Sequence, residues 1–158
     1  MSTSARDRWE KDEIVGKELM MIDFDSEFGQ RALKRLKQED VIWLSTVDAK
    51  NGPQPRPMWF HWDGETVLIF SQVEGAKVRH IRRNPKVALN FNSSPDGGDV
   101  VVLLGEAALV EGKIGPDRLK DYIRKYRQGI QDIGMTPESF EADYHVAILV
   151  KPTVLRGF

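Results

Sequence analysis

The chain has 158 residues and a mass of 18.0 kDa, the usual size of one domain with one hydrophobic core. It carries 23 lysines and arginines against 24 aspartates and glutamates, a balance that argues against a general nucleic-acid binder. The absence of cysteine excludes disulfides, thiol catalysis and cysteine-ligated metals. No apolar run is long enough to cross a bilayer, and the N-terminus is too charged for a signal peptide. We therefore expect a cytoplasmic protein that binds neither nucleic acids nor membranes.

Residues 1–24 are polar with scattered apolar positions, and they form either a loose, flexible arm or a short helix. A single domain is expected over residues 25–158. Apolar residues at helical spacing predict helices over 26–38 and 76–83, and two more that begin at Pro116 and Thr136. Apolar and β-branched runs bounded by turn residues predict six strands, over residues 41–47, 54–62, 66–70, 87–91, 99–111 and 144–158.

The connections between the predicted strands are mostly hairpins, as at Asp63-Gly64. Gly105 lies inside a long strand, which indicates a bulge or a bend there. Short strands joined by hairpins favour an antiparallel sheet closed into a barrel with helices around it. The predicted fold class is therefore mainly β with peripheral helices (α+β).

Positive charge is concentrated in residues 77–86, which read KVRHIRRNPK and hold five lysines and arginines with no acidic residue. The rest of the chain is therefore net acidic. A basic segment on an acidic body suggests a site for a small anion, although a solvated helix face gives the same pattern.

Two segments together resemble the flavin-binding split β-barrel superfamily that includes the pyridoxamine 5′-phosphate oxidases. The first is the strand 53–61, PQPRPMWFH, with Arg56 near its start. The second runs from Phe70-Ser71-Gln72 through Ala76-Lys77 to Asn84-Pro85 and the strand after it. The resemblance implies a six-stranded antiparallel split β-barrel of the FMN-binding type, and a homodimer with its cofactor cleft between two barrels.

Within the superfamily the chain looks most like the small oxidoreductases that depend on coenzyme F420. Ala76-Lys77 stands where the oxidases usually have Arg-Lys or Ser-Lys, and His61 stands where they often have a lysine. Their C-terminal arginine–histidine segment has no evident match. The expected cofactor is coenzyme F420, with FMN as the alternative.

The resemblance implies that ten residues bind the cofactor: Arg56, Pro57, Met58, Trp59, Ser71, Gln72, Ala76, Lys77, Arg79 and Arg82. Ser71, Ala76 and Lys77 would hold the phosphate where a strand leads into a helix, because free N–H groups and the helix dipole favour an anion there. Arg79 and Arg82 would hold the acidic tail that F420 has and FMN lacks. For Trp59 the alternative is a core aromatic, and for the arginines a solvated face.

The resulting hypothesis is an oxidoreductase that transfers a hydride between a bound deazaflavin and a small organic substrate. The alternatives are an FMN-dependent oxidase or reductase and a protein that binds a cofactor or heme without catalysis. No residue is assigned as catalytic. A metal site is not expected, because His61, His80 and His145 are far apart in the sequence and have no carboxylate cluster near them.

Overall fold

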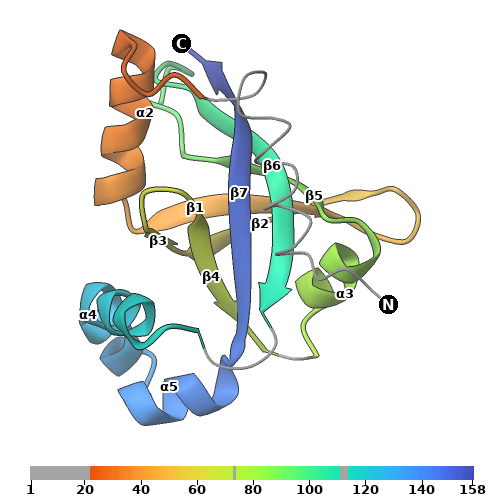
Figure 1. Cartoon of the computed structure of the whole chain (residues 1–158), viewed down its shortest axis with the longest axis vertical. Helices are drawn as coiled ribbons and strands as arrows, with labels where there is room; N and C mark the ends of the chain where they lie inside the picture. Colours follow the sequence, from red (N-terminus) through yellow and green to blue (C-terminus); the bar gives the residue numbers. More distant parts are fainter. Residues whose placement is uncertain (1–21, 73, 111–113) are drawn as a thin grey trace.

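The computed structural model describes residues 22–72, 74–110 and 114–158 of the chain. Helices in these ranges are α2 (Glu27–Gln38), α3 (Ala76–Arg83), α4 (Pro116–Asp132) and α5 (Pro137–Asp143). The strands are β1 (Val41–Val47), β2 (Pro53–Trp59), β3 (His61–Trp62), β4 (Val67–Ser71), β5 (Lys86–Asn90), β6 (Val101–Val110) and β7 (Val146–Gly157). All paired strands are antiparallel, in the order β2-β1-β5-β6-β7-β4-β3 (Figure 1). The predicted mainly-β antiparallel fold is confirmed.

The strand expected over 54–62 is broken at Phe60. Its two parts, β2 and β3, lie at opposite ends of the strand order although one residue separates them in the chain. The chain therefore leaves one edge of the sheet and joins the other within a single residue, which closes the sheet into a barrel. The described residues form six strands when β2 and β3 are counted as one bent strand, as the split barrel implies. The bend was missed because the aromatic run from Trp59 to Trp62 looks like continuous strand.

Helix α4 supplies the polar groups that the bend at Phe60 needs. The Tyr126 hydroxyl accepts a hydrogen bond from the Phe60 N–H at 2.8 Å, and it can donate to the carbonyl oxygen of Phe60, at 2.7 Å, or of Asp40, at 2.8 Å. Lys125 Nζ donates to the carbonyl oxygens of Phe60, at 2.8 Å, and Glu39, at 2.7 Å. Backbone groups at a strand break lose their ladder partners and are costly to bury alone. These two side chains therefore hold the corner of the barrel.

Gly105 marks a bulge between β6 and β7, as its place in a long strand predicted. The register shifts between Leu104 and Gly105, so that Leu104 faces Val154 while Gly105 faces Pro152. A Cβ atom on Gly105 would lie 2.3 Å from the Lys151 carbonyl oxygen, which only glycine avoids. The bulge bends the two longest strands around the barrel.

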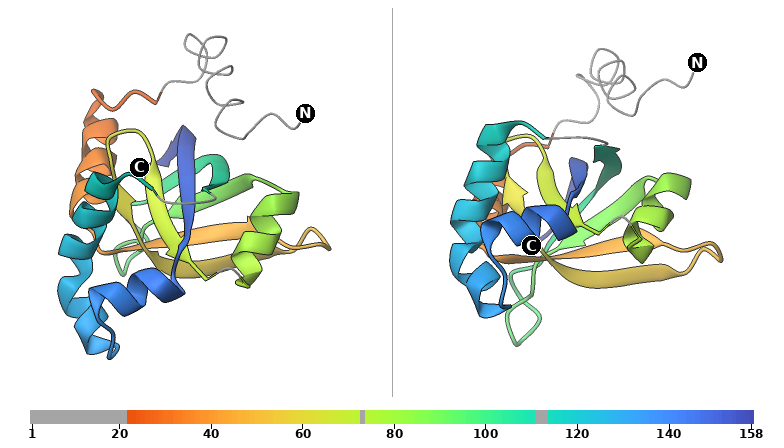
Figure 2. Two further views of the ribbon diagram at one scale, coloured as in Figure 1. Left: turned by 60° about the horizontal axis from the view of Figure 1, so that its bottom comes forward. Right: turned by 90° about the horizontal axis from the view of Figure 1, so that it is seen from below.

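The helices pack on the outside of the barrel. Helices α2 and α4 lie on one side, and α3 lies on the other, beside the β1–β2 hairpin (Figure 2). One buried cluster fills the barrel, and it includes Ile42, Leu44, Phe60, Val67, Leu103 and Ile148. A second cluster joins α4 and α5 to the outer face of β4 and β7, and it includes Leu68, Phe70, Tyr122, Tyr126, Ile130 and Phe140.

The predicted helix boundaries agree with the structure. Ser26 caps α2 by accepting from the Gly29 N–H, and Thr136 caps α5 by accepting from the Ser139 N–H. Of the expected N-terminal arm over 1–24, residues 1–21 lie outside the described residues. Among the residues that are described, no helix is both long and apolar enough to span a membrane.

We expect Tyr126→Phe to lower the free energy of unfolding by about 2 kcal/mol, because it leaves the buried Phe60 N–H without an acceptor. The matched control is Tyr144→Phe, since the Tyr144 hydroxyl makes no hydrogen bond to a described residue and its loss should cost less than about 0.5 kcal/mol. Urea denaturation of both variants measures the difference. Equal stability of the two variants would contradict the role of Tyr126.

Because Lys125 is partly buried, we expect the free energy of unfolding to rise with pH. Burial lowers the pKa of Lys125 from 10.5 to about 8, and the charge of Asp40 offsets part of this effect. Between these two values the unfolded chain holds a proton that the folded protein has released, so folding becomes more favourable as the pH rises. The neutral amine can still donate to both carbonyls. Urea denaturation at several pH values between about 8 and 10 should show the wild type gaining stability relative to Lys125→Met. Parallel curves for the two proteins would exclude Lys125 as the titrating group.

Candidate functional site

A groove of about 230 Å³ lies between helix α3 and the β1–β2 hairpin. Figure 2 shows the hairpin running along this helix and extending past it. The hairpin contributes Leu44, Thr46, Asp48, Gln54, Arg56 and Met58 to the lining, and α3 contributes Ala76, Lys77 and His80.

Strand pairing explains why the hairpin residues share one face. Leu44 faces Arg56 across the two strands, and Thr46 faces Gln54, so each pair projects to the same side. On α3, Ala76, Lys77 and His80 share a face because residues three and four apart are neighbours on a helix. The opposite side of α3 is anchored in the barrel by the buried residues Val78 and Ile81.

The end of the groove at the start of α3 is cationic. Gly75 is the N-cap of α3 and provides no side-chain cap, and the first turn holds no acidic residue. The helix therefore keeps free N–H groups at its positive end. Lys77 Nζ donates to the hydroxyl of buried Ser71 at 3.3 Å, which holds the ammonium beside this end. A Cβ on Gly75 would lie 2.9 Å from Ser71 Oγ, so glycine keeps this corner open.

The two cations of the groove repel each other. Burial lowers the pKa of Lys77, and the positive charge of Arg56 lowers it further. Within the described part of the chain, neither Lys77 nor Arg56 forms an ion pair with an acidic side chain. Two facing cations beside a helix N-terminus are stabilised by an anion between them. This end of the groove is therefore suited to bind an anion such as a phosphate.

The other end of the groove is polar and includes the carboxylate of Asp48. Thr46 Oγ1 and His80 Nδ1 are hydrogen bonded at 2.8 Å. The Asp48 carboxylate accepts from the backbone N–H groups of Lys50 and Gly52 and from Gln54 Nε2, and the two backbone bonds are the main cause of its lowered pKa. Asp48 therefore stabilises the hairpin turn. Among the described residues, no group of three or more potential ligands is arranged to hold a metal ion.

The structure places the ten predicted cofactor residues in three groups. Arg56, Met58, Ala76 and Lys77 line the groove, and Ser71 lies behind it, bonded to Lys77. Pro57 and Trp59, with Met58, line a second cavity of about 220 Å³ beside α4 and α5. Gln72, Arg79 and Arg82 line neither cavity.

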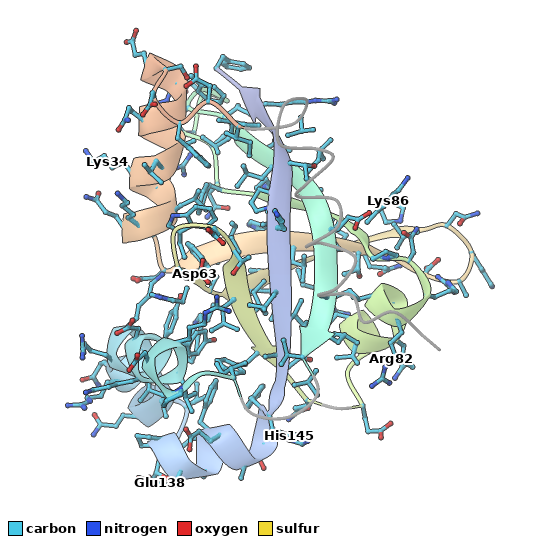
Figure 3. The ribbon with its side chains drawn as sticks, in the orientation of Figure 1. Lys34, Asp63, Arg82, Lys86, Glu138 and His145 are labelled. Carbon is cyan, nitrogen blue, oxygen red and sulfur yellow. The ribbon has the colours of Figure 1, made fainter. Side chains whose placement is uncertain are left out.

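The residues outside the cavities still lie close to the start of α3 or on its surface. The Gln72 carbonyl oxygen accepts from Ser71 Oγ and from the Gly75 N–H. Arg79 is exposed, and its guanidinium donates to the Glu74 carbonyl oxygen at 2.7 Å. Arg82 projects from α3 away from the barrel (Figure 3). Neither arginine reaches into the groove, so any role in binding would concern a part of a ligand that extends along α3.

Trp59 packs against the helices as a core aromatic does. Its ring stacks on Tyr126 with centroids 4.8 Å apart and planes 7° apart, and it lies 6.1 Å from the Phe140 ring. Gly129 of α4 leaves room for it, because a Cβ there would lie 2.9 Å from the indole. The ring is thus fixed by α4 while it forms part of the wall of the second cavity.

Sequence reasoning missed five residues of the groove: Leu44, Thr46, Asp48, Gln54 and His80. His80 could have been predicted, because it lies three residues after Lys77 and four after Ala76, on the same face of the helix. Thr46 had a weaker signal, as a polar residue at an inward position of the alternating strand β1. Asp48 and Gln54 join the groove only through the geometry of the turn between β1 and β2.

The sequence profile described as pyridoxamine 5′-phosphate oxidase matches residues 28–157, which include nearly every described element. The chain belongs to this family. A curated relative, pyridoxine/pyridoxamine 5′-phosphate oxidase 2 of Hydrogenovibrio crunogenus, is 31% identical over 72 residues. That match covers 45% of this chain and 34% of the relative, so the chain spans about a third of the relative's length.

Two solved structures resemble the fold over most of its length. One is a candidate pyridoxamine 5′-phosphate oxidase from Listeria innocua, with a TM-score of 0.61, 25% identity, and coverage of 80% of this chain and 94% of that one. The other is an F420 reductase, with a TM-score of 0.58, 27% identity, and coverage of 78% and 94%. This family membership confirms the expected superfamily, and the similar structures include both a candidate oxidase and an F420 reductase.

Proposed function

We propose that the chain is an oxidoreductase that binds coenzyme F420 in the groove between α3 and the β1–β2 hairpin. The observation that carries this proposal is the pair Lys77 and Arg56, two cations that face each other beside the uncapped N-terminus of α3. They provide the charge and the donors that a phosphate diester needs. Membership of the pyridoxamine 5′-phosphate oxidase family supports a flavin or deazaflavin as the molecule that carries this phosphate.

The residues of the groove fit such a cofactor. Lys77, Arg56 and the N–H groups at the start of α3 would hold the phosphate, and Gly75 keeps the space above Ser71 open for it. Leu44 and Met58 provide an apolar surface farther along the groove, which suits a flat ring system. When bound, reduced F420 supplies a hydride. The chain itself orients the ring, binds the phosphate and excludes water.

The basic surface of α3 favours F420 over FMN. Arg79 and Arg82 are exposed on the helix whose N-terminus would hold the phosphate, and the chain has no acidic residue between Lys77 and Lys86. F420 carries an acidic tail beyond its phosphate, whereas FMN ends there. A tail that runs along α3 would meet these arginines.

We also propose that the protein is a homodimer, as expected from the family resemblance. In this arrangement the partner barrel would cover the open side of the groove. The small organic substrate would then bind next to the ring, within the cleft.

We expect purified protein to bind F420 at micromolar concentration, and Lys77→Met to weaken this binding by about tenfold or more, because a charge-assisted hydrogen bond is lost. The fluorescence of F420 during titration measures both. Lys86→Met is the matched control, since Lys86 is exposed on β5 outside the groove and points away from the barrel (Figure 3). Failure of the wild type to bind F420, or an equal effect of both substitutions, would refute the phosphate site.

A second prediction separates F420 from FMN. We expect the double variant Arg79→Ser/Arg82→Ser to bind F420 several-fold more weakly while its affinity for FMN is unchanged, because only F420 has a charged tail to contact these arginines. Parallel titrations at low and high salt measure this difference. A yellow purified protein that releases FMN and ignores F420 would favour the FMN-dependent alternative. Heme binding that does not respond to Lys77→Met would favour the non-enzymatic one.

A further inference from the structure

The second cavity lies on the far side of β2 from the groove and has a different chemistry. It is bounded by the end of β2 and by α4 and α5, and its walls are aromatic. Phe70 packs edge-on against Tyr122 at 4.7 Å, and Phe140 stacks on Tyr144 at 4.7 Å. Among the described residues, none that lines this cavity is charged. Such walls suit a flat, uncharged aromatic molecule.

Two phenol groups give the cavity polar contacts. Neither the Tyr122 nor the Tyr144 hydroxyl forms a hydrogen bond within the part of the chain that the structure describes. The Tyr122 side chain is only 2% exposed. In the described residues, Trp62 Nε1 is the one fully enclosed side-chain polar atom without a hydrogen bond, so the Tyr122 hydroxyl is not fully enclosed. Its hydroxyl therefore opens onto the cavity. A ligand with an acceptor atom could take this hydrogen bond in place of solvent.

Met58 connects the two cavities. It lines the groove together with Arg56 and Lys77, and it lines the aromatic cavity together with Trp59 and Tyr122. A molecule in the aromatic cavity would thus contact the same side chain as a cofactor ring in the groove.

We propose that the aromatic cavity binds the organic co-substrate, as a flat, uncharged aromatic molecule that carries an oxygen acceptor and receives a hydrogen bond from Tyr122. Its role as co-substrate rests on the proposed function, whereas its binding does not. The aromatic rings would hold the flat part, and the phenols would select molecules with an acceptor at the edge. Selection of this kind is strong because the alternative leaves a buried donor unpaired.

The test uses two probes of nearly equal shape, 2-acetylnaphthalene, which has a carbonyl oxygen, and 2-ethylnaphthalene, which has none. Calorimetric titration should show that the wild-type protein binds the ketone more tightly than the hydrocarbon. Tyr122→Phe should weaken binding of the ketone by about five- to tenfold and leave the hydrocarbon unchanged, because it removes one hydrogen bond. Equal effects on both probes would overturn the role of the hydroxyl.

Ile133→Trp tests the location without disturbing the core. Ile133 is 53% exposed and lines the cavity, so a larger ring there should obstruct entry and weaken both probes. Lys77→Met should leave both affinities unchanged, which separates this test from that of the phosphate site. The proposal would be overturned if the wild type bound neither probe, as expected where a second copy of the chain covers the cavity. It would also be overturned if Ile133→Trp bound both as the wild type does.

Discussion

The hydrogen bonds that Tyr126 and Lys125 make to the backbone of Phe60 hold the bend at which the barrel closes. The barrel closes because the chain passes from β2 to β3 at this residue, and the turn exposes peptide groups that no strand can pair. Tyr126 and Lys125 supply the missing partners from α4, 65 or more residues away in the chain. A change in their position would shift the end of β2, and with it the side chains of both cavities.

Strand β2 shows how this constraint reaches the candidate site. Its residues alternate between two surfaces, so that Arg56 and Met58 face the groove while Trp59 faces α4 and stacks on Tyr126. The same tyrosine thus fixes the bend by its hydroxyl and the orientation of β2 by its ring. The prolines at positions 53, 55 and 57 have no N–H to donate, so β2 can form a regular set of hydrogen bonds with a neighbouring strand on one of its two edges only. Since β2 pairs with β1 through the intervening residues, the outer edge of this strand is poorly suited to accept another strand.

Local signals made much of the fold predictable, and long-range contacts account for what was missed. Helix α3 was predicted to the residue, because its start follows Gly75 and its end precedes Asn84-Pro85. The bulge was also predictable from a local signal, the position of Gly105 inside a long strand. The bend at Phe60 had no such signal, because it depends on Tyr126 and Lys125. In the site, Lys77 and Ser71 could be found from the motif they share, whereas Thr46 joins them only once β1 lies beneath α3.

The electrostatics of the groove distinguish a binding site from a structural one. An ion pair that stabilises a fold brings opposite charges together, as Arg118 and Asp63 do at 3.0 Å. Lys77 and Arg56 instead bring like charges together at the positive end of a helix, and burial adds to the cost of the Lys77 ammonium. Such an arrangement lowers the stability of the protein by itself. An anion at this point would remove the repulsion and satisfy the free N–H groups of α3, so the cost in folding becomes a gain in binding. The aromatic cavity lies on the other side of Met58, where the Tyr122 hydroxyl forms no hydrogen bond within the described residues and is open to a ligand. The two cavities, one cationic and one aromatic, lie on either side of a single strand, and that strand is held in place by the corner at Phe60.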